Sequence, residues 1–275
     1  MLTPSMTNPY YFEIMYGVED QAYAEDLAVM LMNTNRDRHR AQQLLDAMKK
    51  RIAFGLIVCA AEISIEDLLT LYQQHGMPMV LINRQSNIDY IPSVTMDLRN
   101  SVYRVTQYLV GLHHRHIGYL GRQSDANIGN SEKRRGIAMA LQELDLNLQE
   151  RHCTFGSPTI EGGYQAMSSL LALPPHERPT AVISFNDLMA VGALQAINMH
   201  GLRVPEDISV VGFDGITMTA HTHPPLTTVN QPKFRLGQLA VEMLVQLRNG
   251  DLRHGTYTLL ENELIIRGST GPAPR

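Results

Sequence analysis

Short apolar runs alternate along the whole chain with longer segments of helical periodicity, and this alternation limits the possible folds more than any other feature. The apolar residues of each run are consecutive, as in strands that helices cover on both faces. The runs that we predict to be strands are 27–33, 55–60, 79–83, 93–96, 116–121, 181–185 and 208–213. The segments that we predict to be helices are 9–24, 38–51, 65–75, 98–112, 131–144, 161–173, 187–200 and 234–249.

A strand, a helix and a second strand in that order form a right-handed crossover, because the helix packs back onto a twisted sheet only in that hand. The alternation therefore predicts an α/β fold with parallel sheets. The predicted strands outnumber those of an average sheet, so we expect two sheets, with the first break near Asp97. The first helix is expected to start at Pro9, with Asn8 as its cap.

The composition excludes several classes of protein. The chain has 275 residues, 44% of them hydrophobic, and a net charge of −4 from 23 Lys and Arg against 27 Asp and Glu. Such a balance gives no electrostatic attraction to nucleic acid or to an anionic membrane surface. The longest apolar run, 54–61, is shorter than the ~18 residues that a membrane span needs. Because the start of the sequence has no basic and apolar leader, we expect a cytoplasmic protein.

Motifs of the common enzyme classes are absent from the sequence. It contains no GxxxxGKS/T phosphate loop, no GxGxxG, no GxSxG, no HExxH and no CxxC. We therefore expect no enzymatic activity, no metal site and no cofactor. The segment HHRH at 113–116 is interpreted as a solvated helix end, because Arg115 adds positive charge where a metal would need ligands.

Three aspartates follow the carboxyl ends of predicted strands: Asp97, Asp187 and Asp214. Ligands of open α/β sheets bind outside these ends. Asp187 is interpreted as the cap of the helix that follows it, whereas Asp97 and Asp214 are interpreted as ligand-binding residues. Carboxylates accept two hydrogen bonds each and so suit neighbouring hydroxyl groups. A sugar or another polyol is the ligand that this pattern favours.

Several segments match the pattern of one known family. They are VLINR at 80–84, SVTMD at 93–97, RPTAVISFNDLMAVGAL at 178–194, GLRVPEDISVVGFD at 201–214, PPLTTVNQP at 224–232 and ENELIIRGST at 261–270. Together they resemble the effector-binding core of the lactose-repressor/galactose-repressor family of bacterial transcription regulators. The resemblance extends over essentially the whole chain.

The resemblance implies the fold of periplasmic sugar-binding proteins: two similar Rossmann-like lobes with parallel sheets, joined by three crossovers, with a ligand cleft between the lobes. We expect the first lobe to comprise 1–98 and 231–252, and the second lobe to comprise 99–230 and 253–275. Members of the family carry a helix-turn-helix DNA-binding module upstream of this core. The 275 residues contain no counterpart of that module, so DNA binding is expected only through a module outside them.

The resemblance also implies a set of ligand-binding residues. Tyr10 and Tyr11 match an aromatic pair that packs against a sugar or a base, and Asn83 and Asp97 match positions of the first lobe. Positions of the second lobe and of a crossover are matched by Asn186, Asp214 and Gln231.

Lys133 and Asn83 depart from the usual pattern of the family. Lys133 occupies a position where the family usually has arginine, and a lysine cannot make the planar two-pronged contact of a guanidinium. Asn83 stands where aspartate is usual, so the site loses one charge. The lysine argues against the usual sugar pose of the family, and the loss of the carboxylate at Asn83 favours a ligand with fewer hydroxyl groups, or an anionic one.

The function that the resemblance implies is that of a ligand-sensing regulatory domain. It would bind a small effector (a sugar, a sugar phosphate or a nucleobase-like molecule) and change the geometry of a homodimer, and so control operator binding. Met189, Met199 and the loop 217–222 resemble interface segments of the family, although methionine at helical spacing is more often part of a core. The alternative is a solute-binding protein of a sugar transporter.

Overall fold

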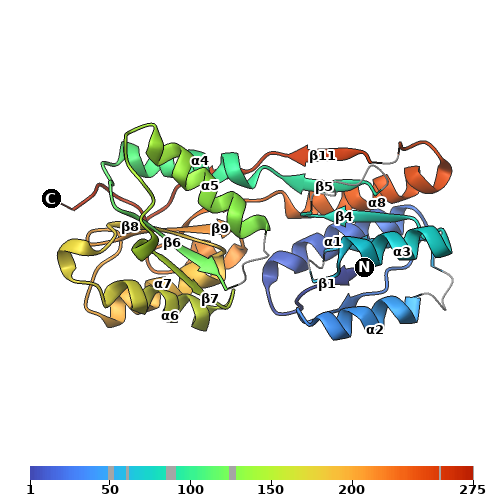
Figure 1. Cartoon of the computed structure of the whole chain (residues 1–275), viewed down its shortest axis with the longest axis horizontal. Helices are drawn as coiled ribbons and strands as arrows, with labels where there is room; N and C mark the ends of the chain where they lie inside the picture. The colour runs from blue at the N-terminus through green and yellow to red at the C-terminus, as the bar shows by residue number, and fades with distance from the viewer. Residues whose placement is uncertain (49–52, 60–61, 85–90, 124–127, 254, 275) are drawn as a thin grey trace. The chain divides into compact units, whose positions relative to one another are not determined.

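The computed structural model describes residues 1–48, 53–59, 62–84, 91–123, 128–253 and 255–274. The chain forms two compact units (Figure 1). The first unit comprises Met1–Met96 and Pro232–Glu261, and the second comprises Asp97–Gln231 and Asn262–Arg275. The chain therefore passes three times from one unit to the other.

The first unit contains a six-stranded sheet with the order β11-β5-β4-β3-β1-β2, in which neighbouring strands run parallel. Its strands are β1 (Leu2–Thr3), β2 (Met32–Asn33), β3 (Leu56–Val58), β4 (Met79–Ile82), β5 (Ser93–Met96) and β11 (Tyr257–Leu260). Its helices are α1 (Pro9–Ala24), α2 (Arg38–Met48), α3 (Ile65–His75) and α8 (Lys233–Asn249).

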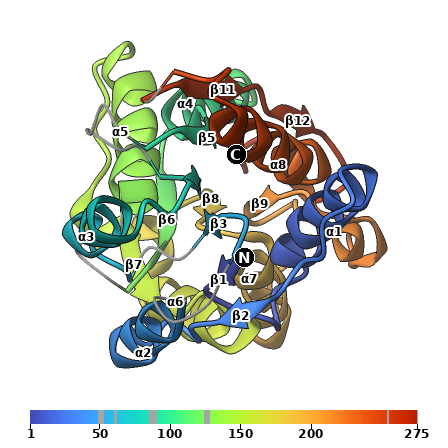
Figure 2. The same cartoon turned by 90° about the vertical axis from the view of Figure 1, so that its right-hand side faces the viewer.

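Helices cover both faces of this sheet because the side chains of each strand point alternately to one face and the other. Leu56 and Val58 pack with α2 and α3 in one apolar cluster. The opposite face of β3, β4 and β5 contacts α8, and α8 packs along α1. Figure 2 shows α1 and α8 on one side of β1 and β3, and α2 and α3 on the other.

The second unit contains a six-stranded sheet with the order β12-β10-β9-β8-β6-β7. Its strands are parallel except for β12, which is antiparallel to β10. The strands are β6 (Ile117–Arg122), β7 (Cys153–Gly156), β8 (Ala181–Ser184), β9 (Ser209–Asp214), β10 (Thr227–Asn230) and β12 (Glu263–Ile265). The helices are α4 (Leu98–Gly111), α5 (Ile128–Gln142), α6 (Ile160–Leu171) and α7 (Asp187–Met199), with 3-10 turns at Glu150–His152, Pro175–Glu177 and Thr217–His221.

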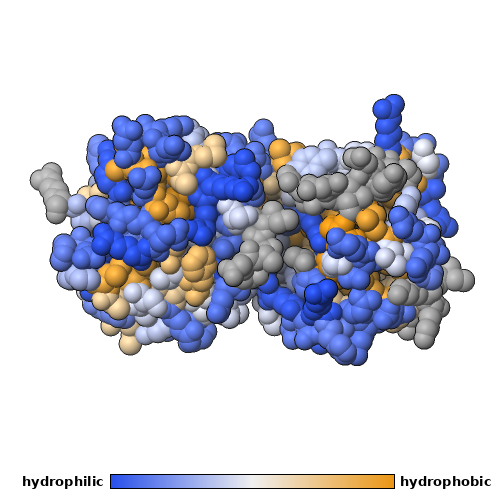
Figure 3. All heavy atoms as spheres, viewed as in Figure 1, coloured by the Kyte–Doolittle hydropathy of each residue, from blue (hydrophilic) through white to orange (hydrophobic). Residues whose placement is uncertain are grey.

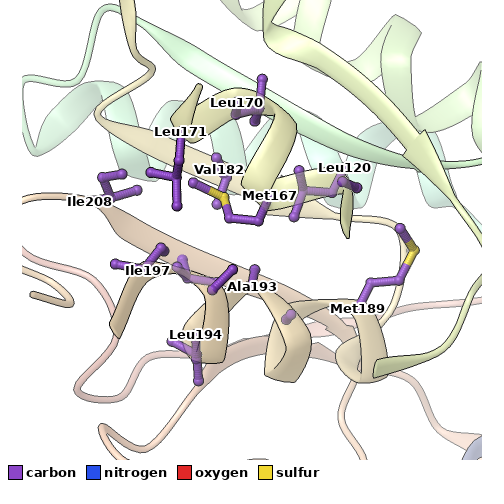
Figure 4. Packing of buried hydrophobic residues seen from close by; sticks show 14 of the residues in the cluster. Leu120, Met167, Leu170, Leu171, Val182, Met189, Ala193, Leu194, Ile197 and Ile208 are labelled. Atoms are coloured by element: carbon purple, nitrogen blue, oxygen red, sulfur yellow. The ribbon is translucent and has the colours of Figure 1, made fainter. Parts of the chain in front are cut away.

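Alternating residues of β8 and β9 divide this unit into two apolar layers. Ile183 and Phe213 pack with α4 and α5, whereas Val182 and Val210 pack with α6 and α7. Figure 4 shows side chains of α6 and α7 on facing sides of the second layer, with Leu120 and Val182 of the sheet behind them. The continuous apolar runs of the sequence therefore reflect strands that are covered on both faces, as predicted.

Glycines allow α6 and α7 to approach each other at the level of the backbone. A Cβ atom on Gly163 would lie 2.1 Å from the Met189 carbonyl oxygen, and one on Gly192 would lie 1.9 Å from the Ile160 carbonyl oxygen. Both distances are far below van der Waals contact. Any larger residue at these positions would therefore force the two helices apart.

The structure confirms the α/β class and two mainly parallel sheets, and it corrects several details. Asn8 caps α1 by accepting a hydrogen bond from the Tyr10 amide at 3.0 Å, as expected. The predicted strand 27–33 is reduced to Met32–Asn33, and the strands Cys153–Gly156 and Thr227–Asn230 were not predicted. The predicted helix residues 49–51 lie outside the described residues. The assignment of 253–261 to the second lobe is wrong, because β11 pairs with β5 of the first sheet, and residues 97–98 and 231, which were assigned to the first lobe, belong to the second unit.

No helix in the described part of the chain is long and apolar enough to span a membrane. The face displayed in Figure 3 is mainly hydrophilic, with small separate hydrophobic areas. Most of the large apolar residues are gathered in the layers beneath the helices, although some, such as Tyr23 and Met199, are exposed.

The interpretation of 113–116 as a solvated helix end is wrong for His114. Its imidazole is completely buried; Nε2 donates to the Gly271 carbonyl oxygen at 3.0 Å, and Nδ1 is 2.9 Å from the Thr180 hydroxyl. Because a carbonyl oxygen can only accept, the neutral ring with its proton on Nε2 satisfies both contacts. Burial lowers the pKa of His114, and it also lowers that of His152, which lies beside the Glu177 carbonyl.

A pair of glycine substitutions tests the close approach of α6 and α7. Gly163→Ala should lower the free energy of unfolding by about 1–3 kcal/mol, because the new methyl group meets backbone atoms that cannot rotate away. Gly111→Ala is the control: its Cβ meets no atom within 4 Å, and alanine should stabilise this helical position by about 0.5–1 kcal/mol. Urea unfolding of both variants measures the difference. Equal stability of the two would contradict the packing described above.

Acidification should destabilise the protein through its buried histidines. A histidine whose folded pKa lies below the unfolded value of about 6.5 binds its proton more readily when the chain is unfolded, so stability present above pH 6.5 is lost as the pH falls below it. The denaturant concentration at the midpoint of unfolding should fall as the pH is lowered from about 7.5 to about 5. His114→Gln should be less stable at neutral pH but should lose less on acidification. A wild-type midpoint that rises on acidification would refute this explanation.

Candidate functional site

Polar residues of the second unit follow three neighbouring strands at the point where each ends. Asn186 follows β8, Asp214 ends β9, and Gln231 follows β10. The strands lie side by side in the order β10-β9-β8 and run parallel, and Asn230 is in register with Asp214. The three side chains therefore originate at one edge of the sheet, which is where open α/β sheets bind their ligands.

Asp214 and Gln231 are in direct contact. The Gln231 side-chain amide donates to Oδ1 of Asp214 at 2.8 Å, and the Asp214 side chain is only partly accessible, with 7% of the residue exposed. Asp214 has φ = 136°, a conformation that residues with a Cβ atom rarely adopt. Backbone strain of this kind persists only where the surrounding structure imposes it, and it is concentrated at functional sites.

Lys133, on α5, is held among aromatic rings and carboxylates. Its ammonium nitrogen lies 3.5 Å from the ring centre of Phe213 and 4.5 Å from that of Phe185, and it donates a hydrogen bond to the Phe185 carbonyl oxygen. Burial lowers the pKa of Lys133 to about 8, against the opposing effect of the nearby Asp214 and Asp187 carboxylates. The position thus supplies a compact buried charge rather than a planar fork.

The structure corrects the interpretation of Asp187. The cap of α7 is Asn186, whose side-chain oxygen accepts from the Met189 amide at 2.9 Å. Asp187 is the first residue of the helix and is completely buried; it accepts from the Ile216 amide at 2.8 Å and from the Thr228 hydroxyl at 2.5 Å. The side-chain amide of Asn186 also donates to the Pro158 carbonyl oxygen at 3.2 Å, so its contact with a ligand stays a prediction.

Asp97 is half-buried and caps α4 by accepting from the Asn100 amide at 2.9 Å. The sequence analysis placed it on the first lobe, whereas it is the first residue of the second unit. Its carboxylate thus has a role in the fold, and its role in binding stays a prediction.

In the first unit the structure brings together two of the three predicted residues through a direct contact. Tyr10 lies at the start of α1, after β1, and its hydroxyl group accepts a hydrogen bond from the amide of Asn83, which follows β4. The rings of Tyr10 and Tyr11 meet edge to face, with centres 5.1 Å apart and planes at 82°. Because β1 and β4 belong to one parallel sheet, all three residues lie at its carboxyl edge.

Sequence reasoning missed the rings of Phe185 and Phe213, which flank the ammonium group of Lys133. Each phenylalanine stands next to a residue that was singled out, Asn186 or Asp214. The available signal was this position at the end of a strand, since the carboxyl ends of β8 and β9 meet at one edge.

A pocket of about 340 Å³ in the first unit lies at the opposite edge of its sheet, near the amino ends of β1, β2 and β3. In the part of the chain that the structure describes, the side chains that line it are apolar, for example Val18, Leu27, Met30 and Leu244. These residues offer no hydrogen-bonding side chain to a polar effector. Among the described residues, no group of three His, Cys, Asp or Glu side chains is placed to hold a metal ion.

Comparisons with known proteins agree with the fold and with the resemblance noted in the sequence. The family model for periplasmic binding proteins and the sugar-binding domain of the LacI family matches residues 1–267. The HTH-type transcriptional repressor PurR of Pectobacterium carotovorum subsp. carotovorum is 35% identical over 275 residues, which are 100% of this chain and 80% of that protein.

Two solved structures are similar in both sequence and fold. The transcription regulator CcpA of Lactococcus lactis has a TM-score of 0.89 and 27% identity, covering 98% of this chain and 97% of the other. The transcriptional regulator CelR in complex with cellobiose has a TM-score of 0.88 and 26% identity, covering 98% of this chain and 83% of the other. These relatives are transcription regulators, not enzymes. The chain belongs to the LacI family and comprises the ligand-binding regulatory domain of that family.

Proposed function

We propose that this regulatory domain binds a small uncharged polar effector, a sugar first of all, through the carboxyl edge of the second sheet. The observation that carries the proposal is the Asp214 carboxylate, which is held by Gln231 in a strained backbone conformation at that edge. A fixed carboxylate accepts hydrogen bonds from hydroxyl groups without further reorganisation.

The charges around Lys133 favour an uncharged effector over an anionic one. One ammonium group faces two carboxylates, those of Asp187 and Asp214, and it already donates to the Phe185 carbonyl oxygen. A phosphate added next to Lys133 would therefore meet two carboxylates as well as the one ammonium group. We accordingly favour a free sugar over a sugar phosphate, which differs from the anionic option left open by the sequence.

The cellobiose complex of CelR supports a sugar, because that regulator shares this fold at 26% identity. A nucleobase-like molecule is the second candidate, because aromatic side chains such as Tyr10 and Tyr11 stack on planar bases as well as on sugars. The contribution of these tyrosines is measured separately from that of Asp214, by Tyr11→Ala.

We further propose that the effector controls operator binding by a homodimer, through a helix-turn-helix module such as the names of the relatives indicate. A ligand can shift such an equilibrium only by its difference in affinity for two arrangements, typically about 1–3 kcal/mol. Met189 cannot form the dimer interface because it is buried in the core around α7. Met199, 69% exposed, remains available. The similarity to repressors does not favour the transporter alternative.

Ligand-dependent melting tests the proposed effector class. D-ribose, D-galactose, cellobiose, hypoxanthine and D-ribose 5-phosphate are each added to the purified protein, and an uncharged compound should raise the melting temperature more than the phosphate does. Asp214→Asn should weaken that binding about tenfold, because hydrogen bonds from ligand hydroxyl groups to a charged carboxylate are stronger than those to a neutral amide. Asp145→Asn, at an exposed position, is the control and should bind as the wild type does. A full melting shift with Asp214→Asn would disprove the assignment of this carboxylate.

The strain at Asp214 predicts an order of stability between two variants. Asp214→Gly should unfold with a free energy about 1 kcal/mol higher than Asp214→Ala, because only glycine adopts φ = 136° without a steric cost. Both variants lack the carboxylate, so both should lose effector binding. Denaturant titration compares them directly, and an alanine variant as stable as the glycine variant would show that the backbone at this position is relaxed.

A further inference from the structure

We propose that Asp187 is a positioning residue of the effector site: its buried carboxylate fixes the turn that follows Asp214 and balances the charge of Lys133. The inference rests on the proposed function, since it assigns Asp187 a task in the same site without contact with the ligand. Neither the sequence segments that resemble the family nor the similarity to other regulators assigns this positioning role to Asp187.

The carboxylate of Asp187 holds both residues that follow Asp214. One oxygen accepts from the Ile216 amide at 2.8 Å. The other accepts from the Thr228 hydroxyl at 2.5 Å, and the same hydroxyl oxygen accepts from the Gly215 amide at 3.3 Å. The Asp187 carboxylate thus holds Ile216 directly and Gly215 through the Thr228 hydroxyl group.

This turn needs an external anchor. Asp214 has φ = 136° and Gly215 has φ = 70°, so two consecutive residues leave the regions preferred by ordinary residues. The carboxylate also lies directly against β9, since a Cβ atom on Gly212 would be 2.2 Å from its Oδ1. With both sides of the turn fixed, the direction of the Asp214 side chain is fixed as well.

Through Thr228, the Asp187 carboxylate also acts on Gln231, the second residue that we propose to face the ligand. Thr228 lies on β10 in register with Gly212 of β9, and the same strand leads into Gln231, whose amide donates to Asp214. Movement of Thr228 relative to Asp187 would therefore displace Asp214 and Gln231 together. One buried carboxylate controls two groups that it does not touch.

Charge gives Asp187 a second effect on the site. The charged groups that face Lys133 are the Asp214 carboxylate from β9 and the Asp187 carboxylate from α7. Both favour the protonated form of Lys133 and so counteract the effect of its burial. Removal of either charge should make the ammonium group lose its proton at a lower pH.

A structural role alone would have a different signature. An acidic residue in the first turn of a helix stabilises that helix through the dipole of its N-terminus. In that case a substitution at Asp187 would lower the melting temperature, but it would leave the titration of Lys133 and the exchange of amide protons beyond Asp214 unchanged.

The deciding experiment compares the full 275-residue chain with Asp187→Asn, Thr228→Val and Thr228→Ser, and uses Asp145→Asn as the exposed control. NMR follows the titration of Lys133, assigned by the signal that Lys133→Arg removes. The midpoint should be lower in Asp187→Asn than in the wild type and should not move in the control. Hydrogen exchange of the Gly215 and Ile216 amides should accelerate at least tenfold in Asp187→Asn.

Thr228→Val should accelerate exchange at Gly215 as well, and Thr228→Ser, which keeps the hydroxyl group, should restore the wild-type rate. If Asp187→Asn fails to fold, the exchange rates of the two Thr228 variants decide whether the turn after Asp214 depends on this hydrogen-bonded pair. Unchanged Lys133 titration together with unchanged exchange in Asp187→Asn would overturn the inference, whatever the change in melting temperature.

Binding of D-ribose, D-galactose, cellobiose and hypoxanthine completes the test. Any of these that binds the wild type should bind Asp187→Asn about tenfold more weakly, and undiminished binding would contradict the positioning role. If none binds the wild type, the proposed effector class fails. The titration and exchange measurements need no ligand, so they still decide the role of Asp187.

Discussion

Parallel pairing of the strands is the constraint on which the two groups of candidate ligand residues, one in each unit, depend. Because β8, β9 and β10 run in one direction, the residues that follow them meet at one edge, although Asn186 and Gln231 are far apart in the sequence. The same rule places Tyr10 and Asn83 at one edge of the first sheet. An antiparallel neighbour would carry such residues to the opposite edge. The helices that enforce the parallel arrangement therefore determine where these candidate residues lie.

Much of the fold follows from local patterns in the sequence. The helix Pro9–Ala24 was predicted with its limits because Asn8 and Pro9 mark its start, and Ile65–His75 was predicted from its helical periodicity; the structure adds Ser64 as its N-terminal cap and Gly76 as its C-terminal cap. Elements that depend on distant partners were predicted less well. The segment 27–31 is apolar like a strand, but it lines a pocket instead of pairing, and β11 joins the first sheet only through its pairing with β5. Such strand pairings are determined by tertiary contacts, which the local periodicity of the sequence does not reveal.

The candidate site was predicted less completely, because several of its polar groups also hold the fold together. Asn186 and Asp187 are adjacent and both able to cap a helix, and only the structure shows which of them does so. Lys133 was recognised as unusual, but its aromatic surroundings come from the ends of two strands and depend on their register. Residue type thus indicates where a ligand-binding group can be. The hydrogen bonds that each polar atom already makes within the protein determine whether it can also bind a ligand.

Two of the predicted ligand residues lie beside crossovers of the chain. Asp97 is the first residue after the first passage between units, and Gln231 is the last residue before the second. If both residues bind the ligand as predicted, the ligand contacts the chain directly beside two of its three passages between the units. Its binding energy would then act on the connecting segments themselves, which is where a hinge transition changes the backbone. The third passage, after Glu261, has no predicted ligand residue beside it.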